Sequence, residues 1–224
     1  MARSIRLAAL LFGFIATLAP PLVAQEPALA GDLRSAATRG DRALVARLIG
    51  QKAPLDAKDG QGQTALLLAV ASGHTDIARL LIDAGADINA VAANKDTPWM
   101  LAGARGHAAM LQHMIPRGPD FSLRNRFGGN ALIPACERGH LEAVKVLLTT
   151  QIAIDHVNNL GWTCLLEIVV LSQGGPRDVE VTRLVLEAGA NPNIADKDGV
   201  SPLAHARKRG FKEIARLIEA KGGR

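Results

Sequence analysis

Apolar and polar residues follow one another along this chain in short blocks that recur at a fixed spacing. Residues 62–90 read GQTALLLAVASGHTDIARLLIDAGADINA, in which two apolar segments are separated by Gly73. In the second segment Ile77, Leu80 and Leu81 are three and four positions apart, which places them on one face of a helix. The pattern predicts two helices separated by a turn, followed by an extended stretch and a polar turn.

The residues between these blocks are of the kinds that begin and end helices. Thr64 is suited to cap a helix over 65–72, because its hydroxyl can accept a hydrogen bond from a backbone N–H of the first turn. Gly73 and Gly85 can adopt a positive φ. We therefore expect them to end the two helices, the second of which spans 76–84.

The same unit recurs along most of the chain. The glycines that end the first helix and the polar residues that begin it are spaced by 33 residues: Gly40, Gly73, Gly106 and Gly139, and Thr64, Thr97, Asn130 and Thr163. Self-similarity at a fixed period indicates a stacked array of repeats. One unit cannot bury its apolar face alone, so each unit must pack against its neighbours.

Several segments match motifs of a known family: Thr97-Pro98 at a helix start, the Gly-His pairs at 73–74, 106–107 and 139–140, LLIDAGADINA (80–90) and LVLEAGANPNIAD (184–196). On these residues the chain resembles the ankyrin repeat family over 31–222. The resemblance implies an all-α solenoid of about six helix-turn-helix units with hairpin-like loops. It also implies a concave face, formed by the first helices and the hairpin tips, on which partners usually bind.

The repeat register divides residues 31–222 into six units, of which the first and last are expected to be end caps. The units are 31–58, 59–91, 92–124, 125–157, 158–195 and 196–222. The first lacks the Thr-Pro start, so Asp32–Thr38 is expected to be a degenerate capping helix. Two prolines interrupt the pattern: Pro134 lies in a first turn, where it is tolerated, and Pro116 is expected to end its helix early.

The first 24 residues have the features of a signal peptide. Arg3 and Arg6 precede an apolar run over 7–19, which is too short to span a bilayer. We place the cleavage after Ala24, with 25–30 as a short leader. Cleavage after Ala30 and an uncleaved membrane anchor are the alternatives. Export by the general secretory route predicts a periplasmic location.

Charge and composition narrow the class of partner. The formal net charge is +5, and removing the two arginines of the signal peptide lowers it to +3, which is too weak to argue for nucleic acid. No second apolar stretch approaches 18 residues, so we expect no membrane association after cleavage. Aromatic residues are only 3% of the chain, so its core must be built from Ala, Leu, Ile and Val. We expect a monomer that binds another protein.

The two cysteines are predicted to be free. Cys136 lies six residues after the start of its unit and Cys164 one residue after the start of the next. If neighbouring first helices were in step, this offset would separate the two Cα atoms by about 11–13 Å. That distance exceeds what a disulfide allows.

The sequence contains no arrangement typical of an active site. Three of the six histidines belong to the repeated Gly-His pairs, and the repeat places them too far apart to share one metal ion. Neither H-E-x-x-H, paired cysteine motifs nor G-x-S-x-G occurs, and Gly60-Gln61-Gly62-Gln63 lacks the Lys-Ser/Thr of a phosphate loop. We therefore expect no catalytic residues, no cofactor and no metal.

Basic residues recur at the position just before the helix-ending glycine, which faces the concave side. The residues at this position, here called the ladder, are arginine in four of five units: Arg39, Ser72, Arg105, Arg138 and Arg209. We interpret Arg105 and Arg138 as candidate contacts for a partner with an acidic surface. The alternative is ordinary charge at a helix C-terminus, where the helix dipole favours cations.

Two hairpin tips carry large apolar groups that the repeat does not require. Phe127, Leu160 and Trp162 are therefore candidate interface residues, with packing between neighbouring tips as the alternative. Trp99 differs, because it replaces a helix-facing leucine and is expected in the core. Glu167 lies on the first helix of the fifth unit, where it either contacts a partner or pairs with an arginine such as Arg138.

The fifth unit contains an insertion. Counting from both sides places six residues, Ser172–Arg177, where other units have one glycine. We expect a loop, or an extra turn on the first helix followed by a loop, that leaves both helices undisturbed. Gln173 and Arg177 are candidate contacts, because insertions on one face of a solenoid are commonly binding elements. The alternative is a tolerated surface insertion.

These observations favour a non-catalytic module that holds a partner protein on its concave face, centred on the fourth and fifth units. Such a module would assist or protect a periplasmic enzyme. The alternative is an inhibitor or immunity protein that neutralises a toxic enzyme.

Overall fold

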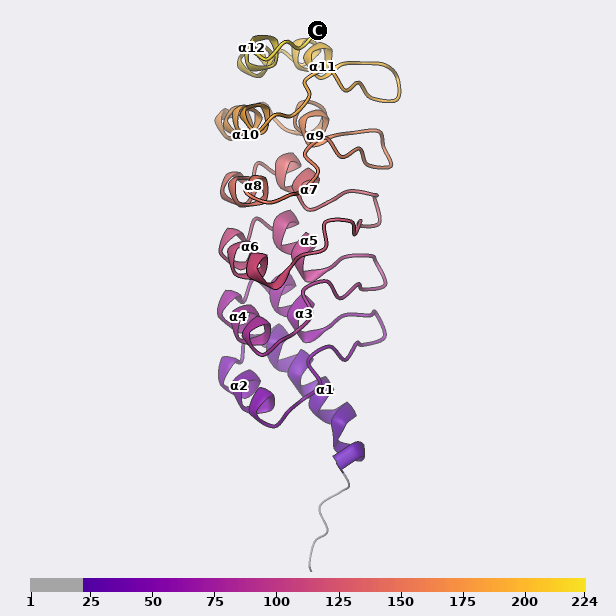
Figure 1. The fold of residues 1–224 in the computed structure, drawn as a ribbon, viewed down its shortest axis with the longest axis vertical. Helices are drawn as coiled ribbons and strands as arrows, with labels where there is room; N and C mark the ends of the chain where they lie inside the picture. The colour runs from indigo at the N-terminus through magenta and orange to yellow at the C-terminus, as the bar shows by residue number, and fades with distance from the viewer. Residues whose placement is uncertain (1–21) are drawn as a thin grey trace, which may run out of the picture.

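The computed structural model describes residues 22–224, in which helices are paired and stacked along one axis (Figure 1). The first helices of the pairs lie in one column: α1 (Leu22–Arg39), α3 (Ala65–Ser72), α5 (Pro98–Ala104), α7 (Leu132–Glu137), α9 (Cys164–Leu171) and α11 (Pro202–Lys208). The second helices form the neighbouring column: α2 (Arg42–Gly50), α4 (Thr75–Asp83), α6 (Ala108–Met114), α8 (Leu141–Leu148), α10 (Pro176–Glu187) and α12 (Lys212–Ala220). The loops between pairs project beyond the first helices, and the described residues contain no strand, which confirms the all-α solenoid.

The local signals read from the sequence act as expected. The Thr64 hydroxyl accepts a hydrogen bond from the backbone N–H of Leu67 at 3.2 Å, and Gly73 has φ 77°. Pro116 lies in a 3₁₀ turn, Ile115–Arg117, that follows the early end of α6. Pro134 occupies the first turn of α7, where the missing N–H removes no helical bond.

The core is continuous along the stack and is built almost entirely from aliphatic side chains. Trp99 is only 2% exposed, as predicted, and its ring meets that of Phe121 edge to face with centroids 5.9 Å apart. No helix in the described part of the chain is long and apolar enough to cross a membrane.

Helix α1 is longer than the predicted capping helix over Asp32–Thr38. It begins at Leu22, and Ala30, Leu33 and Ala37 continue one buried stripe at spacings of three and four residues. This stripe extends the helix into the predicted leader, 25–30. The predicted signal peptide lies almost entirely in residues 1–21, outside the described residues.

The prediction of two free cysteines is wrong. Cys136 on α7 and Cys164 on α9 form a disulfide, with a Cα–Cα distance of 5.6 Å. The prediction assumed that neighbouring first helices are in step along their axes. Instead, the sixth residue of one unit lies against the first residue of the next, as Gly103 and Ala131 do without a disulfide. A Cβ added to Gly103 would lie 3.0 Å from the Cβ of Ala131.

The insertion also departs in part from the expectation. Helix α9 ends at Leu171, and the loop over 172–175 leads directly into α10, which has 12 residues against nine in α4. The added residues therefore lengthen the second helix at its N-terminus, and the expectation that both helices are undisturbed is wrong for α10. The backbone N–H of Gly175 donates to the Asp178 carboxylate at 3.0 Å, which stabilises this extra turn.

Candidate functional site

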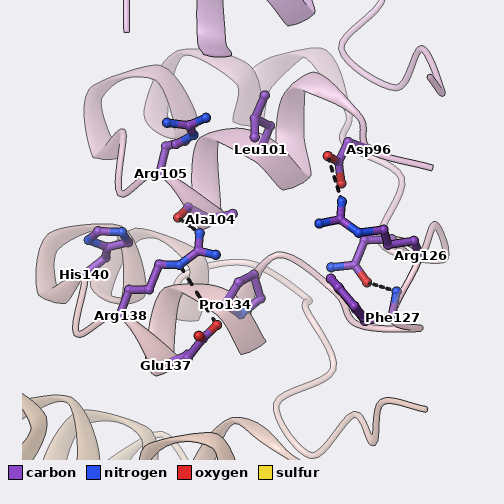
Figure 2. A pocket seen from close by; sticks show the side chains of 11 residues that line it. Asp96, Leu101, Ala104, Arg105, Arg126, Phe127, Pro134, Glu137, Arg138 and His140 are labelled. Atoms are coloured by element: carbon purple, nitrogen blue, oxygen red, sulfur yellow. Dashed lines mark hydrogen bonds and ion pairs between the residues drawn. The ribbon is translucent and has the colours of Figure 1, made fainter. Parts of the chain in front are cut away.

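The surface formed by the first helices and the hairpin tips, here called the concave face, is hollowed at two adjoining places. The first hollow encloses about 660 Å³ and lies between α5 and α7 and their hairpins (Figure 2). The second encloses about 310 Å³ and lies between α7 and α9. The two hollows share Phe127, Glu137 and Arg138 as a common wall.

Two of the ladder arginines hold neighbouring units together. Arg138 donates to the backbone carbonyl of Ala104 at 2.7 Å (Figure 2), and Arg209 donates to that of Val170 at 2.7 Å. The carbonyls at a helix C-terminus have no helical partner, so these guanidinium groups satisfy bonds that the preceding helix leaves open. Part of the ladder therefore has a structural role.

Arg105 differs from these two arginines. It is exposed at the edge of the first hollow, and within the described residues it forms no side-chain hydrogen bond or ion pair (Figure 2). Its guanidinium group is therefore available to an incoming carboxylate.

The histidines of the Gly-His pairs also bridge neighbouring units. His74 contacts the backbone carbonyl of Thr38 through Nε2 at 3.2 Å, and His140 lies directly over Gly106. Burial lowers the pKa of His107 and of His140. In each case a hydrogen bond to a backbone group, of Val70 and of Ala104 respectively, acts in the opposite direction and raises the pKa in part. Among the described residues, no three His, Cys, Asp or Glu side chains are placed to hold a metal ion.

Two of the three apolar candidates at the hairpin tips are exposed on the concave face. Phe127 is 52% exposed and Leu160 is 50% exposed, and both line the second hollow. The Arg126 guanidinium lies 4.5 Å from the centre of the Phe127 ring and 3.8 Å from an Asp96 carboxylate oxygen (Figure 2). Trp162 instead is partly buried against the core and lines neither hollow.

Glu167 lies at the second hollow and is only 5% exposed. Its Oε1 accepts a hydrogen bond from the Asn158 side-chain amide at 2.7 Å. Burial, and then the charge of Glu137, raise the pKa of Glu167 to about 7, while the Asn158 hydrogen bond and Arg138 oppose this rise. Arg138 pairs with Glu137 at 4.0 Å, so the partner of Glu167 is Asn158 and not an arginine.

Gln173 and Arg177 are both exposed, in the loop after α9 and in the first turn of α10. Neither lines a hollow, although Leu171 just before the loop does. The aliphatic part of Arg177 covers Gly139, since a Cβ added there would lie 3.2 Å from the arginine Cδ. It thus occupies the place that His140 takes over Gly106.

Among the residues of the hollows that sequence reasoning missed are Arg126, Glu137, Asn158 and Leu171. Two signals could have found the last two. Asn158 precedes Glu167 by nine residues, as Asp196 precedes His205, and that second pair is in contact at 2.6 Å. Leu171 lies eight residues after Thr163, which is the ladder position of the fifth unit.

Comparison with known proteins supports the same architecture. A family model described as ankyrin repeats (3 copies) matches residues 33–121 and 99–179. An ankyrin repeat protein of Escherichia coli K12, YahD, is 52% identical over 98 residues, which are 43% of this chain. The matched segment spans 49% of YahD, about half of its length.

Two solved structures extend the match over most of the chain. An ankyrin repeat domain from Acinetobacter baumannii AYE is 45% identical with a TM-score of 0.82, covering 86% of this chain and 98% of that one. The ankyrin repeat domain of Bcl-3, a member of the IκB family, is 28% identical with a TM-score of 0.75, covering 86% of each chain. The chain therefore belongs to the ankyrin repeat family, whose repeats form protein–protein interaction modules.

Proposed function

We propose that this chain is a non-catalytic, exported module that binds one partner protein on its concave face over α5, α7 and α9, and so assists or protects a periplasmic enzyme. The observation that carries the proposal is the exposure of Phe127 and Leu160 beside the two hollows. Large apolar side chains at the rim of a concave surface are typical energetic centres of interfaces.

The surface that carries these residues is held in a fixed shape. The disulfide between Cys136 and Cys164 joins α7 to α9, the two helices that flank the second hollow. The backbone N–H of Asn159 donates to the carbonyl of Phe127 at 2.9 Å, which joins the two hairpin tips. A surface that is ordered before binding loses less conformational entropy when the partner docks.

The loop after α9 borders the same surface. Leu171 lines the second hollow, and the exposed Gln173 follows two residues later. We include Gln173 and Arg177 in the proposed contact surface on this adjacency. Replacing Ser172–Arg177 with a single glycine tests this part, because partner affinity falls only if the loop contributes contacts.

A second function is favoured by the first hollow. Arg105, Arg126, Arg138 and His140 all line it, which suits a partner that presents carboxylates. An inhibitor or immunity protein that covers the acidic cleft of a toxic enzyme would use this surface. The two functions differ in outcome: an assisted enzyme keeps or gains activity in the complex, whereas an inhibited enzyme loses it.

The test is capture of the partner from a periplasmic extract on the immobilised full chain. A Phe127→Ala/Leu160→Ala variant should retain the partner more than tenfold less, because removing two interface centres costs about 2 kcal/mol or more each. Val91→Ala/Val157→Ala is the matched control, since these residues are 39% and 44% exposed but line neither hollow. Equal capture by all three proteins would refute the assignment of the face.

A further inference from the structure

The second hollow is lined by apolar and acidic side chains, together with Arg126 and Arg138. Phe127, Leu160 and Leu171 contribute the apolar walls, and each is between 43% and 52% exposed. Glu137 and Glu167 also line the hollow. Apolar side chains beside carboxylates are complementary to a long side chain with a positive end.

Glu167 is built into the structure with one carboxylate oxygen unused. Oε1 accepts from Asn158, while Oε2 forms no hydrogen bond within the described part of the chain. The residue as a whole is only 5% exposed, yet no described side-chain oxygen is both buried and without a hydrogen-bond partner, so Oε2 is open to solvent. The structural contact with Asn158 therefore leaves capacity for one more partner.

The two arginines that line this hollow, Arg126 and Arg138, form no ion pair with Glu167. Arg138 donates to the Ala104 carbonyl on the side of the first hollow, and Arg126 lies between Asp96 and the Phe127 ring. The charge of Glu137 acts on Glu167 more strongly than that of Arg138 does. Glu137 is thus paired with Arg138 at 4.0 Å, whereas Glu167 has no ion-pair partner among the described residues.

The fifth unit also lacks the basic residue that its neighbours carry. The ladder position holds Arg138 in the fourth unit and Arg209 in the sixth, but Leu171 in the fifth. An arginine at this place would lie at the hollow and compete for Glu167. Leucine instead extends the apolar wall and leaves Glu167 without a resident cation.

We infer that the second hollow is a socket for one basic side chain, a lysine or an arginine, presented by the partner protein. Its aliphatic part packs on Phe127, Leu160 and Leu171, and its charged end pairs with Glu167, beside the pair of Glu137 and Arg138. The inference rests on the proposed function and specifies its chemistry: the partner carries a basic residue for this socket beside acidic groups for Arg105.

The pH dependence of this socket follows from the groups around Glu167. Helix α7 contributes Glu137 and Arg138, the hairpin contributes Asn158, and on the α11 side His205 is paired with Asp196. Because the pKa of Glu167 is about 7, the carboxyl is largely protonated in mildly acidic solution. Binding of a basic side chain strengthens as the pH rises through neutrality.

The socket can be tested without the partner by NMR titration of the full-length chain. The probes are Nα-acetyl-arginine amide, Nα-acetyl-norleucine amide and Nα-acetyl-glutamate amide. We expect the arginine probe to shift the signals of Phe127, Leu160 and Glu167 with a Kd on the order of 1 mM. In Glu167→Gln, which keeps the Asn158 contact, that binding should be about tenfold weaker.

The matched control is Glu142→Gln, because Glu142 is an exposed glutamate on α8 whose partner is Lys145. It should bind the arginine probe as the wild type does. Any of three results overturns the inference: no saturable shift with the arginine probe, equal binding of the norleucine or glutamate probe, or equal binding by Glu167→Gln.

Failure of the inference and failure of the proposed function give different results. If Phe127→Ala/Leu160→Ala captures the partner as well as wild type does, the proposed function falls whatever the probes show. If capture depends on these residues but the arginine probe does not bind, only the socket falls.

Discussion

Glu167 offers the sharpest prediction, because its carboxyl group should lower the stability of the native protein at neutral and higher pH. The perturbation is Glu167→Gln, which removes the charge and keeps the side-chain shape and the contact with Asn158. In the native state the pKa of Glu167 is about 7, against an ordinary value of 4.5, because burial and then the charge of Glu137 raise it. The native state therefore holds a proton that the unfolded chain has already released.

The sign and size follow from proton linkage. Between pH 4.5 and 7 the unfolded state binds fewer protons than the native state, so the free energy of unfolding falls as the pH rises. At 1.36 kcal/mol per pKa unit, the difference between the two values corresponds to about 3 kcal/mol. The Gln variant should match wild type near pH 4 and exceed it by about 3 kcal/mol near pH 8.

The assay is urea unfolding followed by circular dichroism across this pH range. The half-buried His107 and His140 contribute with the opposite sign, because their lowered pKa values make stability rise with pH. The difference between variant and wild type cancels these histidines. Glu142→Gln, at an exposed carboxyl, is the control and should follow the wild-type curve. Parallel curves for Glu167→Gln and wild type would refute the reasoning.

Three further predictions concern the disulfide, the loop after α9 and export. Thiol titration of the denatured, unreduced chain should find no free cysteine, and one reactive thiol per cysteine would contradict the disulfide. The Cys136→Ala/Cys164→Ala variant should lower the free energy of unfolding by about 3–4 kcal/mol, because the disulfide closes a loop between residues 28 positions apart. Gly174→Ala should destabilise by about 1–3 kcal/mol in thermal melts, since φ is +69° and the new Cβ would lie against the Phe211 ring; Gly60→Ala, in open space, is its control. Mass spectrometry of the chain recovered from the periplasm should show cleavage after Ala24, because cleavage after Ala30 would remove part of the packed face of α1; recovery from the cytoplasm at full length would overturn export.

The repeat architecture followed from the sequence because its signals are local. The caps at Thr64 and its equivalents, the glycines with positive φ and the apolar spacing within each helix all act over a few residues. Trp99 in the core and the early end of α6 at Pro116 followed from the same reasoning. The family assignment rests on these positions and is confirmed by the comparisons.

What only the tertiary structure decided lies between units rather than within them. The shift of one first helix along the next brings Cys136 to Cys164, and no local pattern encodes that shift. The candidate site has the same origin: the apolar tips were visible in the sequence, but the contact of Asn158 with Glu167 required the hairpin to fold back onto α9. The position of one unit on the next is set by packing between residues about 30 positions apart, whereas helix periodicity and caps are set within a single turn.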